Sequence, residues 1–309
     1  MLSRVAERLY WMSRYLERAE DTARLVNAFS HVILDLPKGS NLEWRVLLDI
    51  FDLGEQFHLN YKNANERNVV KFLLANERNP SSLRYSITAA RENMRTTREV
   101  LPAEAWELVN ECYLFCNANA QSCTSRQLRS DFTEEIIARN LQLTGLLQGA
   151  LLRDHTTRFM RLGRLLERAD MTSRVIEVGA AAILESKSTT AEIPLLWFNL
   201  LNSLSAKSAY QRSVGPILDA NSVVNFVFSN PLFPRSIANC LNRIEEVVGV
   251  MNAPAGLMRN LRRTARKFTE FEAEELSLAE LHRFVDEFQI DLAELNQIFE
   301  EHWFLGGSS

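Results

Sequence analysis

A five-residue motif occurs twice in this chain, and its two copies divide the chain almost evenly. The first copy is Leu16-Glu17-Arg18-Ala19-Glu20 and the second is Leu166-Glu167-Arg168-Ala169-Asp170. The offset between them is 150 residues (166 − 16) in a chain of 309 residues. Self-similarity of this kind is the signature of a repeated structural unit.

The similarity continues on both sides of the motif. At the same offset, the matching pairs are Arg8 and Arg158, Arg14 and Arg164, Thr22 and Thr172, and Arg24 and Arg174. Farther along, Trp44 matches Trp197 at an offset of 153 (197 − 44), and Pro80 matches Pro234 at 154 (234 − 80). Small loop insertions produce such a drift. We infer an internal duplication, with a period far longer than the roughly 20–50 residues of solenoid repeats.

Helical periodicity runs along the whole chain, and no stretch of useful length alternates as a strand would. The sequence therefore predicts an all-α fold, a two-lobed helical body with about six helices per lobe. The lobes cover residues 1–154 and 155–305, and residues 306–309 form a flexible tail or a cloning remnant. Predicted helices of the first lobe cover residues 2–34, 42–61, 65–76, 82–101 and 103–123, and a sixth begins with an N-cap at Asp131.

The second lobe follows the same plan. Its first helix covers residues 155–184, and Pro194 and Pro234 each stand where a first helical residue would. A later helix covers residues 255–275, and the capping box Ser277-Leu278-Ala279-Glu280 opens the last helix.

Composition argues against several classes of protein. The formal net charge is −4, whereas nucleic-acid binding needs an excess of Lys and Arg to neutralise phosphates. No apolar run approaches the roughly 20 residues that span a bilayer, and charge begins at Arg4, so we expect neither a membrane segment nor a signal peptide. Four cysteines give no disulfide framework. A reducing cytoplasm is the simplest compartment.

Four charged residues share one face of the first motif helix. They are Arg14, Glu17, Arg18 and Asp21, at spacings i, i+3, i+4 and i+7. The simplest interpretation is a solvated face with weak intrahelical ion pairs. However, the flanking aromatic residues Tyr10 and Trp11 fit open water poorly, and the Arg and Glu positions recur in the second copy. We therefore infer that the two motif helices meet near a pseudo-two-fold axis, with their charged faces partly buried.

Such a cluster favours a binding or specificity role. Buried Glu–Arg pairs add little net stability, because desolvation offsets much of their attraction. Surplus guanidinium groups bind carboxylates or phosphates, whose geometry they match. Ser13 stands where the second copy has Gly163, and from this difference we expect no effect on the motif. The candidate binding residues are Arg14, Glu17, Arg18, Arg24, Arg164, Glu167, Arg168 and Arg174.

The other constellations are weaker. Cys112, Cys116 and Cys123 lie along one helical stripe, and we interpret them as core residues because free cysteine is usually buried. Glu55 and His58 form a Glu-x-x-His pair, but a di-iron bundle needs two such pairs, and the second lobe has no copy. We predict no metal and no cofactor. No phosphate-binding Gly-rich loop is present, so any ATP chemistry would belong to a partner.

Two helices carry charged stripes of opposite sign. The basic stripe comprises Arg259, Arg262, Arg263, Arg266 and Lys267, and the acidic stripe comprises Glu104, Glu107 and Glu111. Solvated faces are the simpler interpretation. The alternatives are that the stripes pair within the protein, join copies head to tail in a homo-oligomer, or dock a charged partner.

The residues around both motifs resemble a known family. Residues 1–20 closely resemble the start of the Alpha-E family, a bacterial all-helical family named for its ER motif, and residues 161–170 resemble its second ER motif. The resemblance covers essentially the whole chain. It carries over Glu17, Arg18, Glu167 and Arg168 as motif residues.

The resemblance implies a set of partners. Such proteins are typically encoded beside, or fused to, a circularly permuted ATP-grasp ligase that forms amide bonds. A transglutaminase-like protease and a proteasome-related hydrolase are common neighbours. The family therefore looks like part of a peptide-modification system, and the resemblance supplies no catalytic activity for this chain itself.

Three functions remain open at this point. The leading hypothesis is an accessory subunit that acts as a scaffold or presents substrate to the ATP-grasp ligase, with the double Glu–Arg cluster as a docking or anion site. The second is an enzyme that acts on a carboxylate or acyl phosphate, with Glu17 or Glu167 as the catalytic acid or base. The third is a structural protein whose Glu–Arg pairs only set the register between the lobes.

Overall fold

The computed structural model describes residues 2–37, 42–185, 192–271 and 277–305. Within these residues it has 14 α-helices and no strand, which confirms the predicted all-α fold. The first seven helices are α1 (Ser3–Asp35), α2 (Arg45–Ile50), α3 (Gly54–His58), α4 (Glu66–Val70), α5 (Leu83–Arg95), α6 (Ala103–Asn119) and α7 (Arg126–Ala150). The other seven are α8 (His155–Leu184), α9 (Ile193–Ser203), α10 (Lys207–Ser213), α11 (Ala220–Ser229), α12 (Ile237–Gly249), α13 (Ala255–Thr269) and α14 (Leu278–Phe299).

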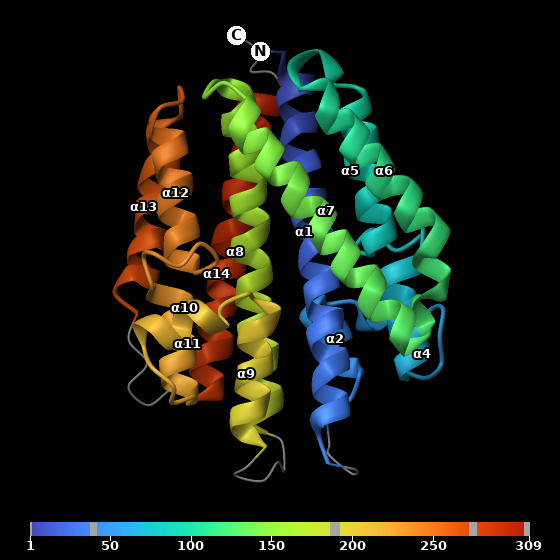
Figure 1. Cartoon of the computed structure of the whole chain (residues 1–309). Helices are drawn as coiled ribbons and strands as arrows, with labels where there is room; N and C mark the ends of the chain where they lie inside the picture. Colours follow the sequence, from blue (N-terminus) through green and yellow to red (C-terminus); the bar gives the residue numbers. More distant parts are fainter. Residues whose placement is uncertain (1, 38–41, 186–191, 272–276, 306–309) are drawn as a thin grey trace.

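The two long motif helices, α1 and α8, run side by side in the same direction through the centre of the molecule (Figure 1). Helices α5 and α7 pack on α1, and helices α12 and α14 pack on α8. Contacts also cross between the halves, since α9 packs on α1 and α2 packs on α8. One hydrophobic core cluster includes buried side chains from both halves. A duplication would produce this order of helices, but the duplication and the lobe boundary after residue 154 stay predictions.

Each half has seven α-helices in its described part, where the sequence predicts about six. The predicted helix 42–61 is interrupted at Asp52, which has a φ of 52°, and Ser205 has a φ of 54° at the matching place between α9 and α10. The next residue then bonds back to the preceding helix: the N–H of Leu53 donates to Leu48 at 2.9 Å. A single left-handed residue leaves the apolar periodicity on both sides intact, so the pattern does not reveal it.

Two predicted helix starts are wrong. Asp131 lies inside α7, and Pro234 precedes α12, which is capped instead by the hydroxyl of Ser236. In both places a residue with good capping chemistry stands a few positions from the true cap. The Pro194 prediction is confirmed to within one position, because this proline lies in the first turn of α9. The capping box at Ser277 is also confirmed.

Two predicted helices are shorter than expected. The helix predicted for residues 82–101 ends at Arg95, and the one predicted for residues 255–275 ends at Thr269. Residues 272–275 and the predicted tail 306–309 lie outside the described residues.

Helices α1 and α8 approach closely at Gly163. A Cβ atom built on this glycine would lie 2.2 Å from the backbone carbonyl oxygen of Tyr10. No side chain fits such a gap, so the difference between Ser13 and Gly163 matters, contrary to the expectation from the sequence. Glycine at position 163 lets the two backbones touch, and this contact holds the two motifs beside each other.

We expect the substitution Gly163→Ala to lower the free energy of unfolding by about 1–3 kcal/mol, as overpacking of a tight contact does. The matched control is Gly145→Ala on α7, where an added methyl meets nothing within 4 Å. That control should stabilise by about 0.5–1 kcal/mol through helix propensity. Urea unfolding followed by circular dichroism compares the two. Equal stability of both variants would refute the close-contact argument.

Candidate anion-binding site

The two motifs are joined by crossed ion pairs between α1 and α8. Arg168 donates to Glu17 with Nε at 2.6 Å and Nη2 at 3.0 Å. Arg18 donates to Glu167 with Nε at 2.5 Å and Nη2 at 3.1 Å. These are two-pronged guanidinium–carboxylate contacts, the strongest kind of charged hydrogen bond. The prediction that the motif helices meet with their charged faces buried is therefore confirmed.

Each glutamate also receives a second arginine. The Nε of Arg14 donates to Glu167 at 2.7 Å, and the Nη1 of Arg235 donates to Glu17 at 2.9 Å. The two carboxylates are only 3% and 1% exposed for Glu17 and Glu167. Both are thus fully enclosed by guanidinium groups. Arg14 is further held by Trp11, whose ring centroid lies 4.9 Å from the guanidinium carbon, which gives the predicted aromatic flank a cation–π role.

Arg235 is the site residue that the sequence analysis missed. Besides Glu17, it donates to Asp21 at 2.6 Å and to Glu20 at 2.8 Å. Its position corresponds to Ser81 at the offset of 154, and Asp21 corresponds to Met171, so this contact has no equivalent in the other half. The sequence contained one signal for this contact: the matched positions of the other half, Ser81 and Met171, both lack a charge.

The electrostatics make the motif glutamates poor acids or bases. Burial acts to raise the pKa of Glu17, but Arg168 and Arg235 outweigh it and hold the pKa at about 2. Burial likewise opposes ionisation of Glu167, but Arg18 and Arg14 lower its pKa. A general base or acid works best with a pKa near the operating pH. Both groups therefore stay ionised and fully engaged, which weakens the enzyme hypothesis.

Asp21 behaves in the opposite way. Burial raises the pKa of its carboxyl to about 7, and the negative charges of Glu17 and Glu20 add to this effect while Arg235 opposes it. Its Oδ2 atom is buried and has no hydrogen-bond partner among the described residues. Three carboxyl groups thus share the single guanidinium of Arg235, and of these Glu17 is also paired with Arg168 and Glu20 with Arg24.

Three of the predicted arginines form no ion pair with the opposite motif among the described residues: Arg24, Arg164 and Arg174. Arg24 and Arg174 each form an ion pair one turn away on their own helix, with Glu20 and Asp170 respectively. Arg24 nevertheless joins the cluster through Glu20. Arg174 contacts neither the cluster nor the cavity beside it among the described residues.

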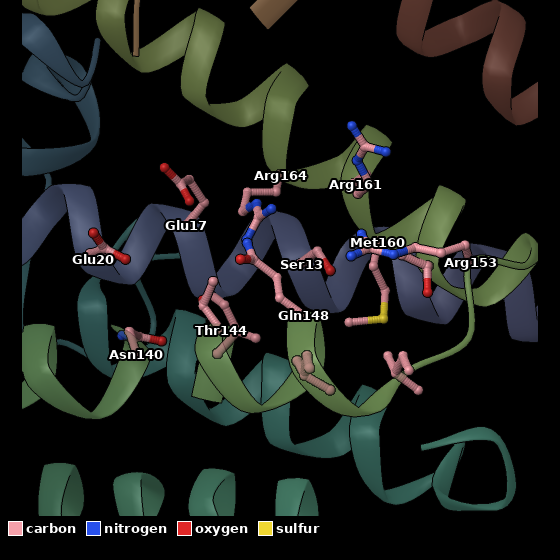
Figure 2. Close-up of a pocket in the computed structure, with 14 residues that line it drawn as sticks. Ser13, Glu17, Glu20, Asn140, Thr144, Gln148, Arg153, Met160, Arg161 and Arg164 are labelled. Atoms are coloured by element: carbon pink, nitrogen blue, oxygen red, sulfur yellow. The ribbon is translucent and has the colours of Figure 1, made fainter. Parts of the chain in front are cut away.

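A cavity of about 290 Å³ opens beside the crossed pairs, between α1, α7 and α8 (Figure 2). Three arginines line it, Arg153, Arg161 and Arg164, and none of them has an ion-pair partner in the described part of the chain. Arg164 contacts Gln148, whose amide oxygen, when turned toward it, accepts from both terminal nitrogens at 3.1 Å. The Nε of Arg164 is buried and has no hydrogen-bond partner among the residues that the structure describes. Burial, together with the positive charge of Arg168, lowers its pKa.

The cavity therefore has an excess of positive charge. Of its two acidic residues, Glu17 is saturated by two arginines, and Glu20 accepts from both Arg24 and Arg235. A buried guanidinium without an anionic partner is costly, and an incoming carboxylate or phosphate relieves that cost. The predicted anion site stays a prediction, and Arg164 is the candidate arginine that lacks an acidic partner among the described residues.

Of the other candidates from the sequence, the three cysteines on one stripe are core residues, as predicted. Cys112, Cys116 and Cys123 are buried, and burial raises the pKa of each thiol. Over the described residues there is no group of three His, Cys, Asp or Glu side chains able to hold a metal ion. No helix in that part of the chain is long and apolar enough to cross a membrane.

The charged stripes do not pair within the protein. Helices α6 and α13 lie on opposite outer sides (Figure 1). The basic stripe is partly neutralised by its neighbours, since Arg262 contacts Glu245 at 2.7 Å and Lys267 contacts Asp291 at 3.1 Å. The head-to-tail and partner-docking alternatives stay predictions.

We expect Glu167→Gln to lower the free energy of unfolding by about 3–5 kcal/mol, because it leaves the largely buried Arg14 and Arg18 without their counter-charge. The control is Glu246→Gln, which removes the exposed partner of Arg243. Exposed pairs contribute about 0–1 kcal/mol. Urea unfolding measures both. If the two variants lost equal stability, the crossed pairs would not be what joins the motif helices.

The raised pKa of Asp21 predicts a pH dependence. Its folded-state value of about 7 lies above the ordinary 3.8, so the folded state holds a proton that the unfolded state releases. Wild-type stability from this group is present below about pH 4 and is lost as the pH rises through about 7. Asn at position 21 does not ionise, so Asp21→Asn should gain stability relative to wild type over this window. A stability difference that stays constant from about pH 4 to pH 8 would contradict the assignment.

Comparison with known proteins agrees with the geometry of the cluster. A family model, Alpha-E, described as a predicted alpha-helical domain with a conserved ER motif, matches residues 1–304. No curated protein and no solved structure matches the chain. The Glu–Arg dipeptides that give the family its description are here the two ends of the crossed ion pairs. The chain therefore belongs to the Alpha-E family.

Proposed function

We propose that this protein is an accessory subunit of an ATP-grasp amide ligase system, and that it presents a carboxylate-bearing substrate to the ligase. The proposal rests on a contrast within one charge cluster: some charged side chains are fully paired, and one arginine is not. Glu17 and Glu167 are each enclosed by two arginines, whereas Arg164 faces the adjacent cavity without an acidic partner in the described part of the chain.

The enclosed glutamates, Glu17 and Glu167, favour a scaffold role. Carboxylates that are buried, ionised and saturated cannot exchange protons with a substrate at neutral pH. They can fix the position of α8 on α1, however, because two-pronged contacts tolerate little displacement. The crossed pairs therefore hold the wall of the cavity in place.

Arg164, which faces the cavity without an acidic partner among the described residues, favours binding of an anion. An ATP-grasp ligase activates a carboxylate as an acyl phosphate and then joins it to an amine. That partner is implied by the family resemblance, and its substrates carry the groups that guanidinium ions recognise. The proposal places this chain in the cytoplasm, where ATP is available. Among the described residues no phosphate-binding Gly-rich loop accompanies the cavity, so ATP binding is assigned to the ligase.

The test is ligase turnover with and without this protein, followed by ADP release and amide product. We expect turnover to require the protein. Arg164→Gln should raise KM for the carboxylate substrate by about tenfold to a hundredfold, the value of one charge-assisted hydrogen bond, with little change in kcat.

The matched control is Arg174→Gln, which removes an arginine of the same helix that lies outside the cavity. It should leave KM unchanged. Turnover that is the same without the protein, or an Arg164→Gln variant with wild-type KM, would rule out the substrate-presenting role.

A further inference from the structure

The cavity beside Arg164 has a filled counterpart on the other side of the molecule. At the offset of 150 residues, Arg164 corresponds to Arg14 and Met160 to Tyr10. Helices α7 and α14 correspond at an offset of 152, because the buried Leu143 and Leu147 match the buried Leu295 and Phe299 (295 − 143 and 299 − 147). This offset places Thr144 opposite Asn296 (296 − 144).

On the filled side, the space is closed by large side chains. Asn296 accepts from the hydroxyl of Tyr10 at 2.6 Å and from Nη1 of Arg14 at 2.9 Å. The ring of Tyr10 lies 5.2 Å from that of Phe304 and 6.3 Å from that of Phe299, measured between centroids. Arg14 thereby donates to two acceptors within the protein, Glu167 and Asn296.

On the open side, smaller residues stand at the same places. Thr144 is too short to reach Arg164 as Asn296 reaches Arg14, and flexible Met160 replaces the rigid Tyr10. The result is the 290 Å³ cavity and a buried Nε without a hydrogen-bond partner among the described residues. The cavity therefore reflects differences in side-chain size at three matched positions: Met160 against Tyr10, Thr144 against Asn296 and Leu147 against Phe299.

The cavity also has a polarity along its length (Figure 2). Arg164 lies in the middle and Glu20 lies at one end near Asn140, whereas Arg153 reaches in from the other end. Only the Oε1 atom of Glu20 accepts hydrogen bonds from described residues, so its second oxygen is available to a donor.

The dimensions limit the ligand. Ser13 and Glu20 both line the cavity from α1, and seven helical residues span about 10 Å. Two extended peptide residues span about 7 Å, which leaves room for a hydrogen bond at each end. The wall between the ends is partly apolar, with Leu16, Leu147 and Met160. A cavity of about 290 Å³ lies at the small end of ligand sites, so larger peptides would extend past its mouth.

We infer that this cavity binds a zwitterionic amino acid or dipeptide, with its carboxylate on Arg164 and its ammonium group on Glu20. The inference rests on the proposed function for its biological setting, but it is testable on the isolated protein. A phosphate fits the arginine end but meets the charge of Glu20 at the other. An ammonium group instead gives Glu20 a third charged partner and completes the hydrogen bonds of the cavity.

The test is calorimetry of the isolated protein with three probes: L-alanyl-L-alanine, its N-acetyl derivative and its C-terminal amide. We expect the free dipeptide to bind and each blocked form to bind at least about tenfold more weakly, since each loses one charged contact. Inorganic phosphate serves as the anion without an ammonium group and should bind more weakly than the dipeptide.

The decisive variant copies the filled side into the open side. The double substitution Met160→Tyr and Thr144→Asn should close the cavity, abolish dipeptide binding and keep or raise the unfolding midpoint. Because this variant is expected to fold, lost binding cannot be attributed to unfolding. Arg174→Gln is the binding-neutral control.

The outcomes separate the two proposals. If N-acetyl dipeptide or phosphate bound as well as the free dipeptide, and Arg164→Gln abolished that binding, the zwitterion inference would fail while the anion site of the proposed function stood. If the filled double variant bound the dipeptide as wild type does, the cavity would not be the site. If none of the probes bound, the inference would be overturned, and the ligase assay would decide the proposed function independently.

Discussion

The buried pairing of Glu17 with Arg168 and of Glu167 with Arg18 is the interaction on which the rest of the structure depends. Ionised groups taken out of water are costly unless every charge is matched, so these four side chains tolerate one relative placement of α1 and α8. The close contact at Gly163 lies beside the pairs and limits the same placement sterically. Packing and electrostatics thus define one geometry, around which the shorter helices arrange themselves.

The proposed ligand site lies where the two halves of the chain differ. The motif residues recur at matched positions of the two halves, and each motif glutamate is paired with two arginines. Among the described residues that line the cavity, the Nε of Arg164 and one oxygen of Glu20 accept or donate no hydrogen bond, and the residues facing Arg164 differ from those at the matched positions facing Arg14. A homodimer cannot create such a difference, because both copies of a residue are identical. A single chain with two related halves can keep one half packed and adapt the other to a ligand.

Much of the fold was predictable from the sequence, because apolar periodicity and a long-range repeat survive many substitutions. The meeting of the charged faces also followed from the recurrence of Arg14, Glu17 and Arg18. The parts of the fold and of the site that could not be predicted depend on contacts between segments distant in sequence. Arg235 and Asn296 reach the cluster from turns and helices that carry no motif, and the reversal at Asp52 depends on one backbone angle. Local patterns hold no record of such contacts.

The different burial of the arginines has a consequence for the response to ionic strength. Mobile ions screen exposed charges over about 10 Å at moderate salt but reach buried pairs much less. The crossed pairs, which hold the framework, are enclosed, whereas Arg153 stands exposed at the cavity. We therefore expect salt to weaken binding of the proposed charged ligand and to leave the crossed pairs that hold α1 and α8 together largely unaffected.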